Sequence, residues 1–310
     1  MRIAVVGSYG VGLTMRLPRL PAAGETLTGG EFATGHGGKG SNQAVAAARL
    51  GAEVSLHSAV GPDAFGQDAR ALWRAEGVDD RHVVTGHSPT MVGVILVEPS
   101  GENRIVIAPG ALDELTAEGV AAFRPAIADA DLLVVGLEIP LAVALAALQI
   151  ARTEGTPTLL NPAPAQPLPV AAWPLIDTLT PNQTEAVILT GGDPAQAERS
   201  PGQIVDHLRG VGRFTGDIVL TRGGAGAVID SPRTGRHEVG AIPVARVVDT
   251  TGAGDAFTAA LAVGIAAGDP LPAAAAFAAA AGAFAVTRAE VLPGLPTRAE
   301  VERVIAAGAA

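Results

Sequence analysis

The chain alternates short apolar stretches with longer helical ones along most of its length. Stretches typical of buried strands include IAVVG, EVSLHSAVG, DLLVVGL, TPTLLNP, LIDTLTPN and GDIVLTRG. Stretches of helical character separate them, among them SNQAVAAARLG, AFGQDARALWRAEG, PLAVALAALQIARTEG and QTEAVILTGG. Strands that alternate with helices of ten or more residues form βαβ units. The pattern therefore predicts an α/β fold with a central, mostly parallel sheet flanked by helices.

Two segments break this alternation, residues 8–36 and roughly 88–110. Both contain alternating apolar residues punctuated by glycine, with no helix between them. Such segments are typical of antiparallel strands, so we expect a small accessory sheet. The proline-rich stretch NPAPAQPLPVAAWP has a strand pattern on each side, which makes it a loop rather than a linker. We therefore expect one domain over residues 1–310.

Charge and composition exclude several classes of partner. The 310 residues include 21 Lys and Arg against 31 Asp and Glu, a net charge of −10, and no basic stretch offsets it. A nucleic-acid partner is therefore not expected. The absence of cysteine excludes disulfides and thiolate metal sites. The N-terminal apolar stretch is too short for a signal peptide and no window resembles a membrane span, so a cytoplasmic protein without a membrane partner is expected.

The stretch VVDTTGAGDAFTAALAVGIAAG places small residues directly before an apolar helix. Gly252, Ala253 and Gly254 leave the backbone bare where a helix begins, and a helix N-terminus attracts anions through its free N–H groups. Asp255 at the same end can accept a proton from a hydroxyl that attacks a phosphoryl group. The alternative is that Asp255 merely favours a helix N-terminus, as aspartate does in many proteins.

A second glycine-rich stretch, GHGGKGSNQAVAAARLG, covers residues 35–51. Ser41 or Asn42 is expected to cap the helix that follows. The spacing excludes a P-loop, because Gly40 occupies the place of the required Ser or Thr. The number of glycines around Lys39 favours close approach of a small ligand over a flexible turn.

Three other patterns are less specific. The glycines of VVGSYGVGL are spaced GxxGxG, which excludes the GxGxxG fingerprint of dinucleotide-dependent enzymes. Asn182 and Glu185 begin a helix three residues apart, a spacing that on its own favours a capping box. The stretch LTRGGAGAVI predicts a hairpin, and the scattered histidines show no metal-binding spacing.

Taken together, two long motifs resemble the ribokinase family, the PfkB-type carbohydrate and nucleoside kinases. DTTGAGDAFTAAL resembles the C-terminal signature of that family, and GGKGSNQAVAAARLGAEVSLHSAVGPDAFG resembles its N-terminal signature. Further segments match in the same order, namely PAAGETLTG, SGENRIVIAPGA, LEIP, LNPAPAQPLP, LTPNQTEA, LTRGGAGAV and AFAVTR. The resemblance implies a ribokinase-like α/β fold with a β lid from residues 8–36 and 88–110. It also implies an ATP-dependent sugar kinase that dimerises through the lid.

The resemblance also implies roles for particular residues. Asp255 matches the catalytic base of the family. Gly252, Ala253 and Gly254 match the anion hole beside that base. Sugar-binding positions are Gly38, Lys39, Asn42, Glu138 and Asp255. Nucleotide-binding positions are Asn182, Thr221, Arg222, Gly223, Gly224, Ala225, Gly226 and Gly254. Glu185 matches a position that handles Mg²⁺ largely through water, and Asp249 and Thr251 match part of a monovalent-cation site. The implied cofactors are ATP and Mg²⁺, with K⁺ as a further one, and for Asn182 and Glu185 this role replaces the simple capping box.

The chain departs from the family pattern in its expected sugar pocket. Relatives usually carry Asn and Asp at the positions of Gly10 and Gly12, where those side chains grip sugar hydroxyls. Their loss is expected to leave a bare side near Tyr9 and His36 that suits a larger or less hydroxylated substituent. Two more departures, Glu290 and Gly294, lie beside the cation site and leave K⁺ dependence open.

The resulting expectation is transfer of the γ-phosphate to a primary hydroxyl of a small sugar, with ribose as the first acceptor to test. The alternative within enzymes is a kinase of another sugar or of a nucleoside. The alternative outside enzymes is a regulator that binds sugar or nucleotide without turnover, against which the intact GAGD turn argues.

Overall fold

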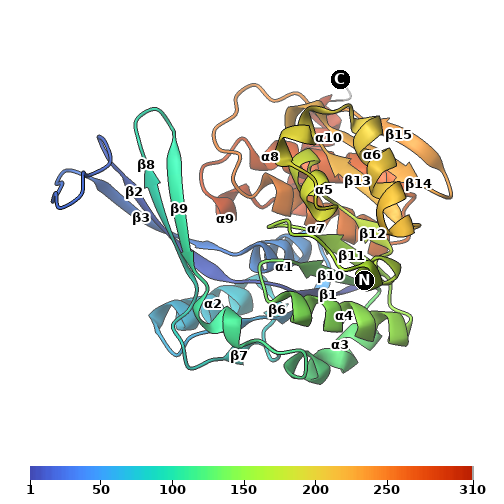
Figure 1. The fold of residues 1–310 in the computed structure, drawn as a ribbon, viewed down its shortest axis with the longest axis horizontal. Coiled ribbons are helices and arrows are strands. Elements are labelled where there is room, and N and C mark those ends of the chain that lie inside the picture. Colours follow the sequence, from blue (N-terminus) through green and yellow to red (C-terminus); the bar gives the residue numbers. More distant parts are fainter. Residues whose placement is uncertain (309–310) are drawn as a thin grey trace.

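The computed structural model describes residues 1–308, and within them a nine-stranded sheet forms the centre of the molecule (Figure 1). Its strands from β6 to β13 run parallel, and β14 and β15 are added antiparallel at one edge. In spatial order the strands are β15 (Gly235–Val239), β14 (Ala227–Ser231), β13 (Asp217–Thr221), β12 (Thr178–Leu179), β11 (Thr158–Asn161), β10 (Leu132–Gly136), β1 (Arg2–Val6), β4 (Glu53–His57) and β6 (Val78–Asp79). The predicted mostly parallel α/β fold is confirmed.

Helices cover both faces of this sheet because its strands are apolar on both sides. In β1, Ile3 and Val5 belong to one buried cluster, and Ala4 and Val6 belong to the other. The first cluster is closed by α1 (Lys39–Arg49), α2 (Ala64–Glu76), α7 (Ala253–Ala266), α8 (Leu271–Ala285) and α10 (Arg298–Gly308). The second is closed by α3 (Arg124–Asp129), α4 (Leu141–Glu154), α5 (Gln183–Leu189) and α6 (Pro201–Gly210).

Shorter elements connect these layers. Strands β5 (Ala59–Val60) and β7 (Val84–Thr85) form a small parallel pair, and α9 (Val291–Gly294) precedes the last helix. The 3₁₀ turns are η1 (Gly110–Glu114), η2 (Gly119–Phe123), η3 (Val170–Leu175), η4 (Pro194–Glu198), η5 (Val211–Arg213) and η6 (Gly223–Ala225).

The alanine-rich C-terminal helices pack face to face inside the first cluster. An added Cβ at Gly264 of α7 would lie 2.6 Å from the Cβ of Ala274 in α8, so only small side chains allow this approach. Of the helices formed by residues 1–308, none combines the length and the apolar character needed to cross a lipid bilayer. The apolar C-terminal helices α7 and α8 contribute many buried residues to the first cluster.

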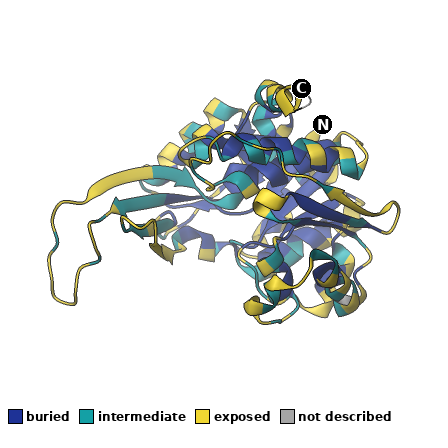
Figure 2. Ribbon diagram, turned by 90° about the horizontal axis from the view of Figure 1, so that it is seen from above, coloured by how far each residue is buried: buried dark blue, intermediate teal, exposed yellow. Residues whose placement is uncertain are grey.

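A second, smaller sheet projects from the body as a lid (Figures 1 and 2). Its order is β3 (Glu31–Gly37), β2 (Gly10–Arg16), β8 (Val92–Val97) and β9 (Asn103–Ala108). The expectation of a purely antiparallel sheet is wrong, because β2 and β8 pair in parallel. The two hairpin-like pairs, β2–β3 and β8–β9, are antiparallel within themselves. They meet through strands that enter the lid from the body in the same direction.

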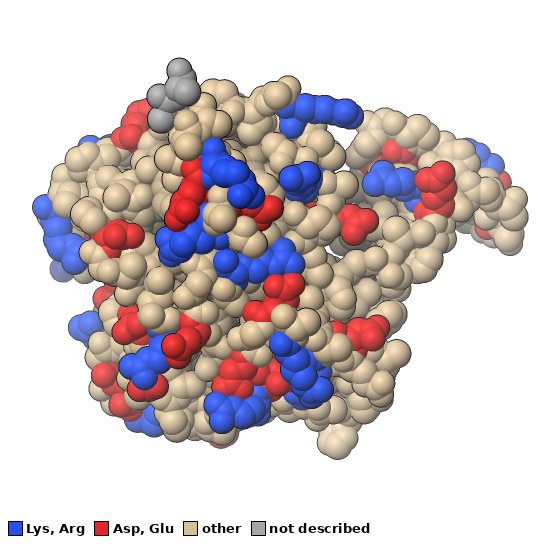
Figure 3. Space-filling view, turned by 180° about the vertical axis from the view of Figure 1, so that it is seen from behind, with Lys and Arg blue, Asp and Glu red and all other residues tan. Residues whose placement is uncertain are grey.

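Charged side chains of both signs are mixed on the surface. Figure 3 shows Lys and Arg beside Asp and Glu on the face seen from behind, rather than one continuous basic area. Arg209 and Asp230, for example, form an ion pair with 2.7 Å between Arg209 Nε and Asp230 Oδ2.

Candidate active site

Asp255 lies in the first turn of α7 and is almost completely buried. Its two carboxylate oxygens accept hydrogen bonds from different side chains of α1. Asn42 Nδ2 donates to Oδ2 at 2.8 Å, and Gln43 Nε2 donates to Oδ1 at 3.1 Å. The N-cap of α7 is Gly252, with a φ of 80°, and no side chain in the described part of the chain caps it. The carboxylate therefore sits at the positive end of a helix whose first N–H groups are not covered by a capping side chain.

Helix α1 begins in the same way, at Lys39 after an N-cap of Gly38 with a φ of 85°. The prediction that Ser41 or Asn42 caps this helix is wrong. Both residues lie inside it, and their side chains have tertiary partners, since Trp73 Nε1 donates to Ser41 Oγ at 2.8 Å and Asn42 reaches Asp255. These contacts tie α1 to α2 on one side and to α7 on the other.

Glu138 follows β10 and faces the start of α1. Its Oε2 accepts hydrogen bonds from Ser8 Oγ at 2.5 Å and from the backbone N–H of Lys39 at 2.9 Å. Burial alone would lower the pKa of Lys39, but the charges of Asp255, Glu138 and Glu185 raise it overall, so its ammonium group stays protonated. The structure thus brings the predicted sugar-binding residues Gly38, Lys39, Asn42 and Glu138 together around Asp255.

The electrostatic state of Asp255 follows from competing influences. Burial raises the pKa of its carboxyl group, and Glu138 adds to this effect. The Lys39 charge and the hydrogen bonds from Asn42 and Gln43 lower the pKa, but its net shift is upward. A carboxylate with a raised pKa that still accepts two N–H groups is suited to take up a proton during a reaction.

A cavity of about 730 Å³ opens on the other side of the α7 N-terminus. It brings together the predicted residues Asn182, Thr221, Gly223, Gly224, Gly226, Ala253 and Gly254. Arg222 and Ala225 instead close the turn, because Arg222 Nη2 donates to the carbonyl of Ala225 at 2.7 Å. The apolar walls were not expected from the sequence: they include Ile242, Val247, Phe257, Ala279 and Val286.

Asn182 and Glu185 form the capping box expected from their spacing alone. Asn182 Oδ1 accepts from the N–H of Glu185, and Glu185 Oε2 accepts from the N–H of Asn182, both at 2.8 Å. Burial raises the pKa of Glu185, although the N–H of Asn182 and the charge of Lys39 oppose this shift. Asn182 also lines the cavity, so the capping box lies where the resemblance predicts a nucleotide and Mg²⁺ site.

Asp249 organises the loop before α7. Its Oδ1 accepts from the N–H of Thr251 at 2.9 Å and from Thr251 Oγ1 at 2.7 Å, and its Oδ2 accepts from the N–H of Glu290 at 3.2 Å. Burial opposes the shift, but these hydrogen bonds lower the pKa of Asp249 overall. Glu290 itself has a φ of 67°, in the left-handed region where glycine is the usual residue. The residues predicted for a cation site therefore form one hydrogen-bonded loop.

The two glycines of the lid strand β2 differ from what we expected. Side chains alternate along a strand, so Gly10 and Gly12 face away from Val11 and from His36, which is the register partner of Val11. The Tyr9 hydroxyl and His36 Nδ1 form a hydrogen bond of 2.8 Å on that opposite face. The expectation that a bare side would lie near Tyr9 and His36 is therefore wrong.

The space beside these two glycines is also unequal. An added Cβ at Gly10 would collide with the Cε of Met91, whose side chain fills the gap. At Gly12 the nearest atom is Ile95 Cδ1 at 3.6 Å, and its register partners are Gly35 and Gly93. A row of three glycines across β3, β2 and β8 thus leaves a bare strip on this face of the lid, bordered by Ile95 and by Ile107 of β9.

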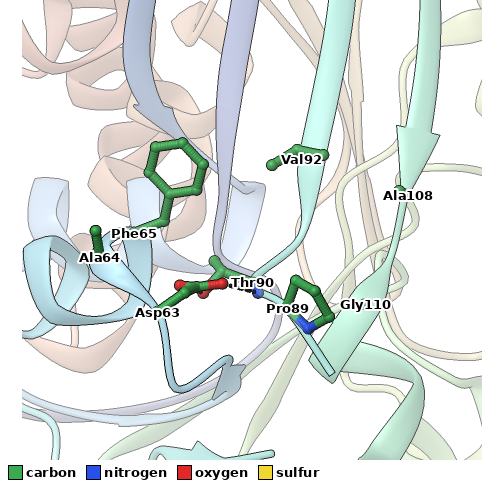
Figure 4. Close-up of a pocket in the computed structure, with 8 residues that line it drawn as sticks. All are labelled: Asp63, Ala64, Phe65, Pro89, Thr90, Val92, Ala108 and Gly110. Carbon is green, nitrogen blue, oxygen red and sulfur yellow. Dashed lines mark hydrogen bonds between the residues drawn. The ribbon is translucent and has the colours of Figure 1, made fainter. Parts of the chain in front are cut away.

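A smaller cavity of about 400 Å³ lies at the base of the lid, between α2 and strands β8 and β9 (Figure 4). Asp63 caps α2 there and also accepts from Thr90, whose N–H and Oγ1 donate at 2.7 Å each. Val92, which lines this cavity, is the register partner of Val11. The cavity therefore lies on the face of the lid opposite to Gly12, and the residues that line it include none of the predicted site residues.

Three polar residues of the site were missed by the sequence analysis. Ser8 holds Glu138, while Gln43 and Asn161 hydrogen-bond to each other at 3.1 Å beneath Asp255. Gln43 follows Asn42 directly, and the segment of Asn161, LNPAPAQPLP, was compared only as a whole. The one available signal was the position of Asn161 at the carboxyl end of a strand, where ligand sites of such sheets lie.

Known carbohydrate kinases resemble this chain over nearly its full length. A model of the pfkB family of carbohydrate kinases matches residues 2–298. The ribokinase of Schizosaccharomyces pombe is 38% identical over 312 residues, covering 97% of both chains, and that of Haemophilus influenzae is 36% identical over 300 residues, covering 96% of both. The structure of Arabidopsis thaliana ribokinase complexed with ribose and ATP superimposes with a TM-score of 0.91 at 29% identity, covering 98% of both chains.

Proposed function

The chain belongs to the pfkB family of carbohydrate kinases and is a ribokinase-like phosphotransferase, and on this premise we propose that it transfers the γ-phosphate of ATP to a primary hydroxyl of ribose. One observation carries the proposal. The buried carboxylate of Asp255 accepts from Asn42, next to Lys39 and Glu138, and Asp255 directly follows Gly254, which lines the 730 Å³ cavity. A sugar on one side and a nucleotide on the other would meet at this group.

The chemistry follows from these positions. Glu138, Lys39 and Asn42 hold the sugar hydroxyls and orient the primary hydroxyl toward Asp255. As that oxygen attacks the γ-phosphorus, its proton passes to the Asp255 carboxylate, and the bond from phosphorus to the bridging oxygen of ADP breaks. The backbone N–H groups of Gly252, Ala253 and Gly254, at the positive end of α7, stabilise the charge on the transferred group.

Two cations are part of the proposal. Carboxylate oxygen is a preferred ligand of Mg²⁺, and Glu185 would hold the ion through water beside the nucleotide. When bound, Mg²⁺ neutralises charge on the phosphates. The Asp249 and Thr251 loop would hold K⁺ mainly through backbone carbonyls, which are hard oxygen ligands as well. Activity with K⁺ compared with Na⁺, each at the same ionic strength, measures that dependence.

A second acceptor class is favoured by the lid. The bare row of Gly12, Gly35 and Gly93 supplies no hydrogen-bonding side chain to a sugar hydroxyl, and Ile95 lies beside it. This surface supports a larger or less hydroxylated acceptor, either another sugar or a nucleoside. We therefore propose this class as the alternative to ribose.

We also propose that a second copy of the chain covers the lid. Several large apolar side chains of the lid are exposed, including Phe32, Ile105, Val106 and Ile107, with Val106 at 71%. Burying such side chains against a second copy removes apolar area from water. Light scattering of the purified protein and of a Val106→Asp variant tests this, since the variant is expected to shift the population toward monomers.

The proposed function is tested by ADP release from ATP against a panel of pentoses, hexoses and nucleosides. We expect at least one acceptor to give ADP release far above that of the matched Asp255→Asn variant. Ribose ahead of all others supports the ribose proposal, and a hexose or nucleoside ahead supports the alternative. Tight acceptor or nucleotide binding with no acceptor-dependent ADP release would show a binding regulator instead and overturn the proposal.

A further inference from the structure

A chain of buried amides lies beneath the Asp255 carboxylate. Gln43 of α1 is 1% exposed, and its Nε2 donates to Asp255 Oδ1 and to Asn161 Oδ1, both at 3.1 Å. Asn161, the last residue of β11, donates through its Nδ2 to the backbone carbonyl of Thr180 at 3.2 Å. The chain connects two neighbouring strands of the large sheet to the start of α7.

The direction of every hydrogen bond in this chain is determined by its far end. A backbone carbonyl can only accept, so Asn161 must present its Nδ2 to Thr180 and its Oδ1 to Gln43. Gln43 must then present its amide nitrogen, and the second hydrogen of that nitrogen points to Asp255. Within residues 1–308 no protein donor reaches Gln43 Oε1, so the amide is held through its nitrogen. Flipping it would place a carbonyl oxygen against both a carboxylate and another carbonyl.

We propose that Gln43 is a positioning residue for Asp255, oriented by Asn161 and the Thr180 carbonyl. This inference rests on the proposed function, because it assumes that Asp255 is the base. Gln43 touches the carboxylate at Oδ1, while Asn42 touches Oδ2. These two donors, one on each oxygen, fix the plane of the carboxylate. The remaining lone pairs of the carboxylate can then accept a hydrogen bond from a hydroxyl. They also favour the ionised form, which a base requires.

Other charges around Asp255 are unchanged when Gln43 is replaced. The charge of Lys39 favours the ionised form of Asp255, and the charge of Glu138 disfavours it. Glu185 of α5 interacts with Asp255 more weakly. Loss of the Gln43 donor therefore adds one effect of known sign, an upward shift in the pKa of Asp255. Because kcat/KM falls as the base becomes protonated, the acid limb of the pH profile should move to higher pH.

The test uses Gln43→Met, which keeps the side-chain length and removes the donor. We expect kcat to fall roughly tenfold or more, the usual cost of a lost hydrogen bond to a charged group, with the KM for ATP little changed. The acid limb of kcat/KM should move up by about one pH unit. Gln43→Glu, nearly identical in shape, should move the limb further in the same direction, because two adjacent carboxyl groups share a proton. Gln43→Glu provides the same test if Gln43→Met does not fold.

Ser41→Ala is the matched control, because it removes a buried hydrogen bond from the same helix on the side facing Trp73. It should lower the thermal midpoint and leave the acid limb in place. If the Gln43 variants keep the wild-type limb, as Ser41→Ala does, Gln43 is only structural and the inference is overturned. In an Asp255→Asn background, Gln43→Met should have no further effect on turnover. Near-normal turnover of Asp255→Asn itself would instead overturn the assignment of the base, so the two failures are distinguishable.

Discussion

Helices α1 and α7 both begin with a glycine in the left-handed region, but the glycines around them exist for different reasons. At the start of α1, an added Cβ on Gly38 would lie 2.5 Å from the Cα of Tyr9, and one on Gly40 would lie 2.6 Å from the Cα of Gly7. At the start of α7, an added Cβ on Gly254 would meet no atom of residues 1–308 within 4 Å. The first turn is filled by backbone. In the second, an added Cβ on Gly252 would lie 2.9 Å from Val291 Cγ1, but Gly254 faces open space.

This difference separates packing from ligand access. Glycine at α1 lets two backbone segments touch, which holds Lys39 and Asn42 in place. Glycine at α7 leaves a helix N-terminus accessible from a cavity, where an anion can reach its N–H groups. The same sequence signal, glycine before a helix, therefore has two physical causes that predict opposite consequences of mutation.

The largest effect is expected at the carboxylate of the open turn. Asp255→Asn keeps the size of the side chain and removes the base, so turnover should fall by about 10² to 10⁴, the range for loss of a general base. ATP binding, measured by calorimetry, should be nearly unchanged. Asp193→Asn is the matched control at the start of η4, where the Asp193 side chain accepts from the N–H of Ala195 and Asn caps equally well. Equal losses in both variants would contradict a chemical role for Asp255.

Gly254→Val tests the open turn itself. The added side chain has room in the protein but would occupy the space proposed for the transferred phosphoryl group. Loss of one such donor costs roughly 3 kcal/mol of barrier, or about a hundredfold in kcat. Steady-state kinetics should show this loss in kcat more than in the KM for sugar. A change confined to the sugar KM would assign the turn to the sugar site.

Gly40→Ala tests the filled turn. Its Cβ would overlap backbone atoms of Gly7 and Ser8, which cannot move as a flexible side chain would. Overpacking of this kind costs about 1–3 kcal/mol of folding stability, and a urea or thermal unfolding curve measures it. Gly37→Ala is the control in the same loop, since its nearest atom would be the Gly10 carbonyl oxygen at 3.6 Å. Equal stability of the two variants would show that packing does not require glycine at position 40.

Strand β2 of the lid also holds one filled and one open glycine position, Gly10 and Gly12. Gly12→Asp has room for its side chain and should improve ribose binding by about 0.5–1.5 kcal/mol for one restored hydrogen bond, seen as a lower KM for ribose. Gly10→Asn would displace Met91 and is expected to lower stability without that gain. A wild-type enzyme with a micromolar ribose KM that Gly12→Asp does not improve would contradict this interpretation of the bare row.

The sequence predicted the architecture because alternation and glycine positions are local signals. The alternating strands and helices gave the parallel sheet, and the order of motifs gave the lid. The parallel pairing of β2 with β8 was missed, because register between distant strands leaves no local pattern. The cap of α1 was wrong for a related reason: Ser41 and Asn42 have partners elsewhere in the fold, and tertiary contacts outweighed their local preference.

The same limit applies within the site. Motifs made Asp255 and Lys39 candidates for the site, because those residues lie in long, distinctive segments. The contact between Gln43 and Asn161 joins positions 118 residues apart, and no spacing rule connects them. The apolar walls of the 730 Å³ cavity were missed likewise, because Ile242, Phe257 and Val286 come from separate segments that only folding brings together.

The burial of Asp255 also links the folding of the protein to pH. Because burial raises the pKa of this carboxyl group in the folded protein, the folded chain binds its proton more tightly than the unfolded chain does. The resulting stability is fully present below the ordinary pKa of an aspartate and is lost as the pH rises through the raised value. Catalysis has the opposite dependence, since the base must be ionised. The stability that Asp255 contributes is therefore largest at a pH below the one at which the enzyme is expected to work fastest, and Asp255→Asn should remove this part of the pH dependence of stability.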